Sequence, residues 1–97
     1  MNNSVPGSIK TQFLYIHFVQ LPGRGSTSVW SCRNTDQGNE LGVVKWNCVW
    51  RQYCYFPAVQ TIYSVGCMRD IIEFIGLVTE AWSLAREAKK RIEGHHD

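Results

Sequence analysis

Long apolar runs are missing from this 97-residue sequence, and with them any stretch of the about 20 residues that a helix needs to cross a bilayer. The first residues, MNNSVPGSIK, lack the basic start of a signal peptide, and no small-residue cleavage pattern follows the apolar stretch at 13–19. The sequence also lacks a large excess of either charge sign. Its net charge of +2 does not by itself indicate a nucleic-acid partner. We therefore expect a cytoplasmic, single-domain protein that does not insert into a membrane.

Motifs for metal binding and catalysis are missing as well. The four cysteines form no CxxC pair, and we expect them to be reduced, small core hydrophobes: Cys32, Cys48, Cys54 and Cys67. His17 lies inside an apolar segment, where a core histidine is the simpler interpretation than a catalytic base. The sequence GRGS at 23–26 lacks the lysine of a phosphate-binding loop. We therefore expect no enzymatic activity, no metal and no cofactor.

Aromatic residues are concentrated in the segment VVKWNCVWRQYCYFP at 43–57, which is typical of strand. Before it, TSVWSCRN at 27–34 alternates polar and apolar residues, NTDQGN supplies a turn, and ELGVVKWN at 40–47 is the next strand. In that strand Val44 and Trp46 share a face with Gly42, which marks a bulge or a close approach by another backbone. A further strand is expected in TQFLYIHFVQL at 11–21, before the turn-rich stretch 22–26.

A short turn at 47–49 is expected to lead into the last strand, WRQYCYF at 50–56, which Pro57 ends. Alternation then places Arg51, Tyr53 and Tyr55 on one face of the strand. The opposite face carries Trp50, Gln52, Cys54 and Phe56. We expect this second set to face the core and the first set to be exposed.

Helical periodicity extends from about residue 67 to Gly94, which sits where a C-capping glycine belongs. Acidic residues dominate the first half and basic residues the last turns, in agreement with the helix dipole. About 27 residues give a helix near 40 Å long, whereas the strands make a sheet only about 20 Å tall. We expect Trp82 to lie in the core. Because the helix is longer than the sheet is tall, its far half needs another partner: the segment 13–21, a second copy of the chain in a homodimer, or a foreign protein.

Exposed aromatic and basic side chains give two binding hypotheses. Trp, Tyr and Arg dominate protein-protein hot spots, which favours a protein partner. The same side chains on a sheet also stack single-stranded nucleic-acid bases, which is the alternative. The predicted contact surface combines an outer sheet face with the basic end of the helix: Lys45, Arg51, Tyr53 and Tyr55, with Arg86, Lys89 and Lys90.

The run LGVVKW-x3-WRQYCYFP, followed by CMRDIIEFI, resembles a family of small uncharacterised proteins of bacteriophages and prophages. In that family a hairpin precedes W-R-x-Y-C-F-F-P and then C-L-x-D-I-x-x-F. The resemblance covers residues 28–75 and carries no residue roles. It implies a phage accessory protein that binds and inhibits a host protein, for instance a defence nuclease in the manner of an anti-CRISPR protein.

Together these observations predict an α+β fold: an antiparallel sheet of three or four strands packed against one long C-terminal helix. We expect an N-terminal arm with an extra strand at 1–26, the sheet-plus-helix domain at 27–94 and a disordered tail at 95–97. The leading function is a non-enzymatic, phage-type protein that binds a host protein in the host cytoplasm.

Overall fold

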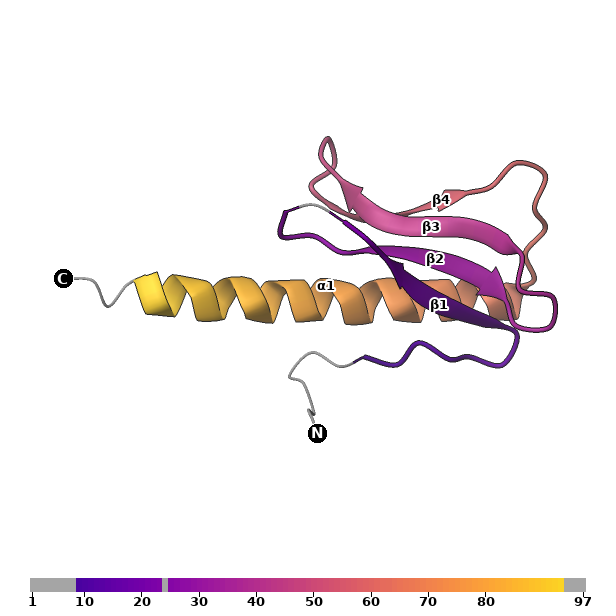
Figure 1. Ribbon diagram of the computed structural model, residues 1–97, viewed down its shortest axis with the longest axis horizontal. Helices are drawn as coiled ribbons and strands as arrows, with labels where there is room; N and C mark the ends of the chain where they lie inside the picture. The colour runs from indigo at the N-terminus through magenta and orange to yellow at the C-terminus, as the bar shows by residue number, and fades with distance from the viewer. Residues whose placement is uncertain (1–8, 24, 94–97) are drawn as a thin grey trace.

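The computed structural model describes residues 9–23 and 25–93, which form a four-stranded antiparallel sheet and one long helix (Figure 1). The elements are β1 (Ile16–Leu21), β2 (Val29–Asn34), β3 (Glu40–Asn47), β4 (Gln52–Pro57) and α1 (Val65–Glu93). Consecutive strands are neighbours in the sheet. The predicted α+β class is therefore confirmed. Over the described residues, no helix combines the length and the apolar character that a membrane span requires.

The first strand belongs to the main sheet. It pairs with β2 along its whole length, from Ile16 opposite Asn34 to Leu21 opposite Val29. The sequence predicts strand over all of 11–21, whereas residues 11–15 fold back along the free edge of β1, where the Phe18 amide donates to the Thr11 carbonyl (2.9 Å). This return covers part of an edge whose backbone groups would otherwise be unpaired.

The hairpin turns β2–β3 and β3–β4 have the same architecture. The side-chain oxygens of Asn34 and Asn47 each accept the amide hydrogens two and three positions further on, at 2.9 to 3.1 Å. Four positions after each asparagine, the amide of Gly38 or Arg51 donates to the asparagine carbonyl (2.7 Å). Both of these residues have a left-handed backbone, with φ 77° at Gly38 and 59° at Arg51. Asparagine thus fixes both turns through its side chain.

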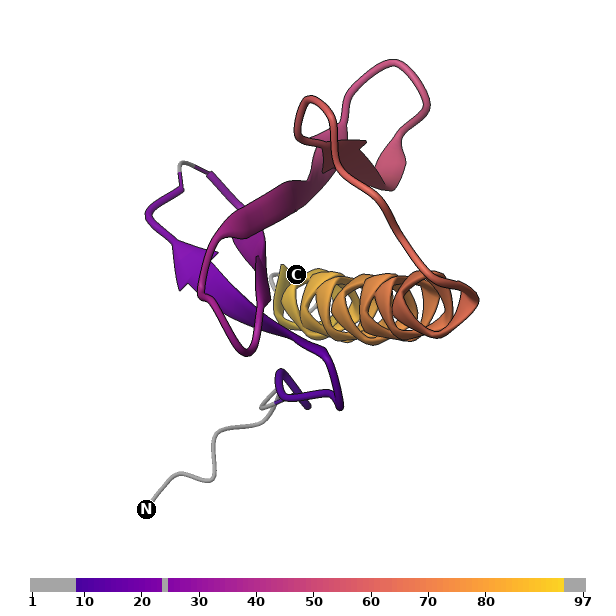
Figure 2. The same cartoon turned by 90° about the vertical axis from the view of Figure 1, so that its right-hand side faces the viewer.

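The helix lies against the concave side of the curled sheet (Figure 2). At the centre of the core, the fully buried ring of Phe74 stacks on Phe18 of β1, with ring centroids 3.8 Å apart. Trp30 meets Phe74 edge-on at 5.2 Å, and further along the helix Trp82 packs on Trp46 at 4.7 Å. The segment 13–21 thus packs on the first half of the helix at Phe74, whereas the side chains from Ser83 to Ile92 stay exposed, so the prediction that this segment covers the far half is wrong. Trp82 is half-buried in this contact.

The helix is longer than the sheet is tall. Ser64 caps its start, because its Oγ accepts the Cys67 amide hydrogen (3.1 Å). Its 29 residues span about 43 Å, whereas strands of six to eight residues span about 20 to 26 Å. The second half projects beyond the sheet, and every side chain from Ser83 to Ile92 is exposed (Figure 1). The predicted cap Gly94 and the tail 95–97 lie outside the described residues.

The predicted orientation of the last strand is wrong. Tyr53 is only 4% exposed, and Tyr55 packs against the same core, whereas Cys54 lies with Lys45 on the outer face. The cause is the preceding turn, which occupies residues 48–51 instead of 47–49. The observed register pairs Trp46 with Tyr53, whereas the shorter turn would pair Trp46 with residue 50. A register shift by an odd number of residues turns every side chain to the other face.

Gly42 makes room for one of these tyrosines. A Cβ at position 42 would overlap the Tyr55 phenol and lie 2.8 Å from the Phe56 carbonyl oxygen. Both alternatives predicted at Gly42 are therefore found: another backbone approaches closely, and the β2–β3 register shifts between Cys32 and Arg33, opposite Gly42 and Glu40. The Tyr55 hydroxyl is hydrogen-bonded to that of Tyr63 (2.8 Å), which donates to the Leu41 carbonyl. Burial, reinforced by the Tyr63 hydrogen bond, raises the pKa of Tyr55. Because its polar end is paired, this tyrosine serves as a core residue.

Candidate functional site

The seven side chains predicted to contact a partner do not form one surface. Lys45 lies on the outer sheet face, with its ammonium group 4.7 Å from the centre of the Phe56 ring. Arg51 belongs to the β3–β4 turn, and Tyr53 and Tyr55 are part of the core side. The remaining three, Arg86, Lys89 and Lys90, lie together on the projecting half of α1.

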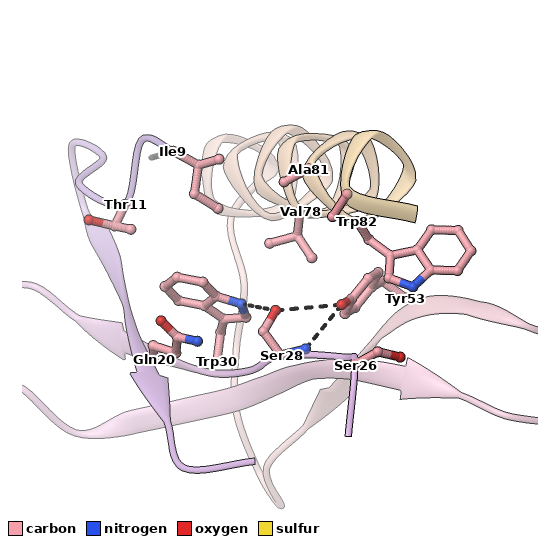
Figure 3. A pocket seen from close by; sticks show the side chains of 11 residues that line it. Ile9, Thr11, Gln20, Ser26, Ser28, Trp30, Tyr53, Val78, Ala81 and Trp82 are labelled. Atoms are coloured by element: carbon pink, nitrogen blue, oxygen red, sulfur yellow. Dashed lines mark hydrogen bonds between the residues drawn. The ribbon is translucent and has the colours of Figure 1, made fainter. Parts of the chain in front are cut away.

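Two adjoining hollows open where the helix leaves the sheet, and we call them together the end groove. The inner hollow, of about 530 Å³, lies between the sheet and the helix (Figure 3). It is lined by Ile9, Thr11, Gln20, Ser26, Ser28, Trp30, Tyr53, Val78, Ala81, Trp82 and Ala85. The outer hollow, of about 540 Å³, is lined by Ser26, Trp82, Ala85, Arg86, Lys89 and Lys90. Three residues border both hollows, so they form one continuous groove.

The floor of the inner hollow is aromatic, and the polar atoms of Trp30, Ser28 and Tyr53 are paired with one another. The indole N–H of Trp30 donates to the Ser28 hydroxyl (2.7 Å), and the Ser28 amide donates to the Tyr53 hydroxyl (3.1 Å) (Figure 3). On the opposite wall the helix presents Val78 and Ala81. These mutual hydrogen bonds leave the apolar faces of Trp30 and Tyr53 for an occupant, beside the polar side chains of Thr11, Gln20 and Ser26. The inner hollow is thus suited to an apolar side chain.

The outer hollow is basic. Among the residues that the structure describes, three cations and no carboxylate line it. The Arg86 guanidinium lies 5.4 Å from the centre of the Trp82 ring, which holds its planar group against the groove wall. The ion pair Lys10–Glu73 (3.8 Å) is the only one among the side chains that the structure describes. No described carboxylate therefore neutralises the cations of the groove.

An exposed apolar turn stands at the same end of the molecule. The β3–β4 turn is at the same end of the sheet as the β1–β2 connection, the end toward which α1 projects (Figure 1). Its outermost side chains, Val49 and Trp50, are 85% and 68% exposed. The sequence reasoning missed both as contact residues, because it placed Trp50 in a strand. The signal that identifies the turn is Asn47, an asparagine at the end of a strand.

The reactive residues elsewhere do not assemble into a catalytic group. His17 lies on the outer face of β1, with Nδ1 3.4 Å from the Thr35 hydroxyl, so its predicted core position is wrong. All four cysteines are free thiols, and the predicted core position is confirmed for Cys32 but wrong for Cys48 in the turn and for Cys54 on the outer face. Burial raises the pKa of the Cys32 thiol to about 11, whereas Cys48 is exposed in the β3–β4 turn. Across 9–23 and 25–93, no cluster of three or more His, Cys, Asp or Glu side chains is arranged to hold a metal ion.

Comparison of the chain with protein-family models, with curated proteins and with solved structures finds no match. The resemblance of residues 28–75 to small phage proteins is not tested by these comparisons and stays a prediction. Any functional assignment therefore depends on the geometry of the end groove.

Proposed function

We propose that this protein acts by binding another protein, and that the end groove takes an acidic, amphipathic segment of that partner. One observation carries the proposal: an apolar hollow continues into a hollow lined by Arg86, Lys89 and Lys90 and by no carboxylate of the described part of the chain. An apolar side chain of the partner enters the inner hollow, while its carboxylates reach the cations of the outer one. Charge-assisted hydrogen bonds of this kind are stronger than neutral ones and fix the orientation of the segment.

The same geometry supports a protein partner over single-stranded nucleic acid. Base stacking needs an aromatic ring with a free face. In the groove, one face of Trp82 packs on Trp46 and the Arg86 guanidinium lies over the ring. Tyr53 and Tyr55, the rings predicted to stack bases, belong to the core side of the sheet. Phosphates would still reach the cations, but stacking on Trp82, Tyr53 and Tyr55 would be missing.

The identity of the partner is proposed on different grounds. That it is a host protein, inhibited by a phage-type protein as an anti-CRISPR protein inhibits its nuclease, rests on the resemblance of residues 28–75 alone. A homodimer through the projecting half of α1 is the competing occupant. In that case a second copy of the chain would cover the exposed stripe that includes Leu84 and Ile92.

The test is capture of proteins from bacterial lysate on the tagged chain, with and without nuclease, using two variants of equal net charge. The variant Lys89→Glu/Lys90→Glu reverses the charge of two side chains in the groove. The variant Lys45→Glu/Arg69→Glu reverses the charge of two exposed side chains outside it. We expect a stoichiometric protein that survives nuclease treatment, is lost about tenfold or more with the first variant and is retained by the second.

Three results would contradict this expectation. Equal retention by both variants would remove the groove from the binding site. Recovery of nucleic acid alone, weakening steeply between about 50 and 200 mM salt, would identify a phosphate-dominated complex. Sedimentation at twice the monomer mass in the absence of any captured protein would identify a second copy as the occupant.

A further inference from the structure

The two asparagine turns of the sheet offer an internal control on what a turn of this geometry requires. They share the side-chain cap, the backbone hydrogen bond of 2.7 Å and the left-handed fourth residue. The β2–β3 turn fills the positions after Asn34 with Thr, Asp, Gln and Gly. These are polar residues that favour turns, followed by the residue that adopts positive φ without steric cost. Turn geometry alone accounts for all of them.

The β3–β4 turn fills the same positions with Cys, Val, Trp and Arg. None of these is demanded by the turn. Val49 and Trp50 are presented to solvent, and Arg51 takes the left-handed conformation that glycine adopts more easily. Exposed apolar surface and backbone strain both oppose folding, and turn geometry accounts for neither, which favours a function other than folding for these residues.

The position of the turn indicates what that function is. Trp46, in the penultimate position of β3, packs on Trp82 of the groove wall, so the turn follows directly from the groove. Its side chains include Trp and Arg, two of the three residues most enriched in binding hot spots. Because the Asn47 side chain already holds the turn in place, little entropy is lost when it docks.

We propose that Val49 and Trp50 form an anchor that inserts into an apolar pocket on the partner protein, and that Arg51 meets carboxylates at the rim of that pocket. The inference rests on the proposed function in that the partner is the acidic protein bound by the end groove. The interface then has two separate points, one where the partner enters this chain and one where this chain enters the partner.

The first experiment replaces the residues of the anchor turn with those at the same positions of the β2–β3 turn. The variant Cys48→Thr/Val49→Asp/Trp50→Gln/Arg51→Gly gives the β3–β4 turn the side chains of the β2–β3 turn. We expect its thermal midpoint to be unchanged or raised, because glycine relieves the left-handed position. Binding to the protein captured by the wild type should weaken at least tenfold. The matched control is Tyr15→Ala, which removes an aromatic ring that is 60% exposed. Tyr15 directly precedes β1, at the end of the sheet opposite the β3–β4 turn.

The second experiment places the photo-cross-linking residue p-benzoylphenylalanine at single positions of the full chain in bacterial cells. Position 50 probes the anchor, position 26 the end groove and position 15 the control surface. We expect positions 50 and 26 to give adducts of the same protein, identified by mass spectrometry, and position 15 to give none.

The outcomes separate the two proposals. An adduct at position 26 but not at 50, with wild-type affinity of the turn variant, would overturn the anchor and leave the groove. Loss of binding in the turn variant while Lys89→Glu/Lys90→Glu binds normally would overturn the groove and leave the anchor. Adducts that contain only a second copy of this chain would overturn a foreign pocket, and no adduct at either position would overturn both proposals.

Discussion

The two halves of α1 carry similar apolar periodicity but have different surroundings. Up to Trp82 the stripe that includes Ile71, Phe74 and Val78 is buried against the sheet. Beyond Trp82 the stripe continues in Ala85, Ala88 and Ile92, yet every side chain from Ser83 to Ile92 is exposed. The comparison shows that periodicity specifies which face of a helix is apolar, whereas the height of the sheet decides how much of that face is covered.

The projecting half of α1 is not stabilised by packing against the sheet, as the packed half is. An isolated helix of about 10 residues is marginal in water, because nucleation is costly and packing supplies most helical stability. Here the packed half provides the nucleus, and Lys90 and Arg91 in the last turn interact favourably with the helix dipole. The projecting half is therefore a helix held at one end, with its cations and apolar residues available to a partner.

The largest expected effect is on the free energy of unfolding, when a side chain of the packed half of α1 is truncated and compared with one of the projecting half. Phe74→Ala should lower the free energy of unfolding by about 3 to 5 kcal/mol, because it removes the ring on which Phe18 and Trp30 pack. Leu84→Ala, in the projecting half, should change it by less than about 0.5 kcal/mol. Urea unfolding followed by circular dichroism measures both. A loss above about 2 kcal/mol for Leu84→Ala would show that the projecting half is packed in the free protein.

A pair of proline substitutions tests the same boundary through the backbone. Thr79→Pro, in the packed half, should cost about 3 kcal/mol or more, since proline removes a hydrogen bond and clashes with the preceding turn. Ala88→Pro should cost less than about 1 kcal/mol while reducing the helical circular dichroism signal, because only the uncovered turns melt. Equal losses of stability from the two variants would mean that α1 unfolds as a single unit.

The smallest expected effect concerns alkaline pH. Burial raises the pKa of Cys32 from about 9 to about 11, and Cys67 of the packed half of α1 is among the groups that contribute. Between these values the unfolded chain loses the thiol proton while the folded chain keeps it. The free energy of unfolding should therefore fall as pH rises from about 9 to about 11, and be independent of this thiol below that range.

Comparing cysteine variants isolates this contribution. Cys32→Ala should reduce the slope of stability against pH in that window, whatever it does to stability at neutral pH. Cys48→Ala, at an exposed position in the β3–β4 turn, should leave the slope unchanged. Part of the slope should remain in Cys32→Ala, because the pKa of Tyr55 is also raised. Identical slopes in all three proteins would contradict the assignment.

Sequence reasoning reached the fold because its signals are local. Alternation of polar and apolar residues predicted β2 and β3, and the asparagine and glycine residues at 34–39 predicted the turn between them. Spacing of apolar residues by three and four positions predicted the helix. It failed on β4 because orientation there depends on register, and register depends on the length of one turn. Had Asn47 been taken as the cap of a four-residue turn, the observed pairing of Val44 with Tyr55 would have followed.

The candidate site was only partly predictable for a related reason. The cations Arg86, Lys89 and Lys90 stand out in the sequence, and they line the outer hollow. Ser28 and Trp30 do not stand out, because nothing local shows that β2 begins beneath the point where the helix leaves the sheet. Trp50 was misplaced together with the turn that carries it.

An antiparallel sheet of three or four strands, one long helix and more helix than the sheet can cover all follow from the sequence, because these properties depend on residues a few positions apart. That β1 joins the sheet, which tyrosines enter the core, where the end groove opens and which apolar turn is exposed at the same end follow only from the tertiary structure. Those properties depend on register and on the crossing of helix and sheet, which join residues distant in the chain and are set by packing the whole domain at once.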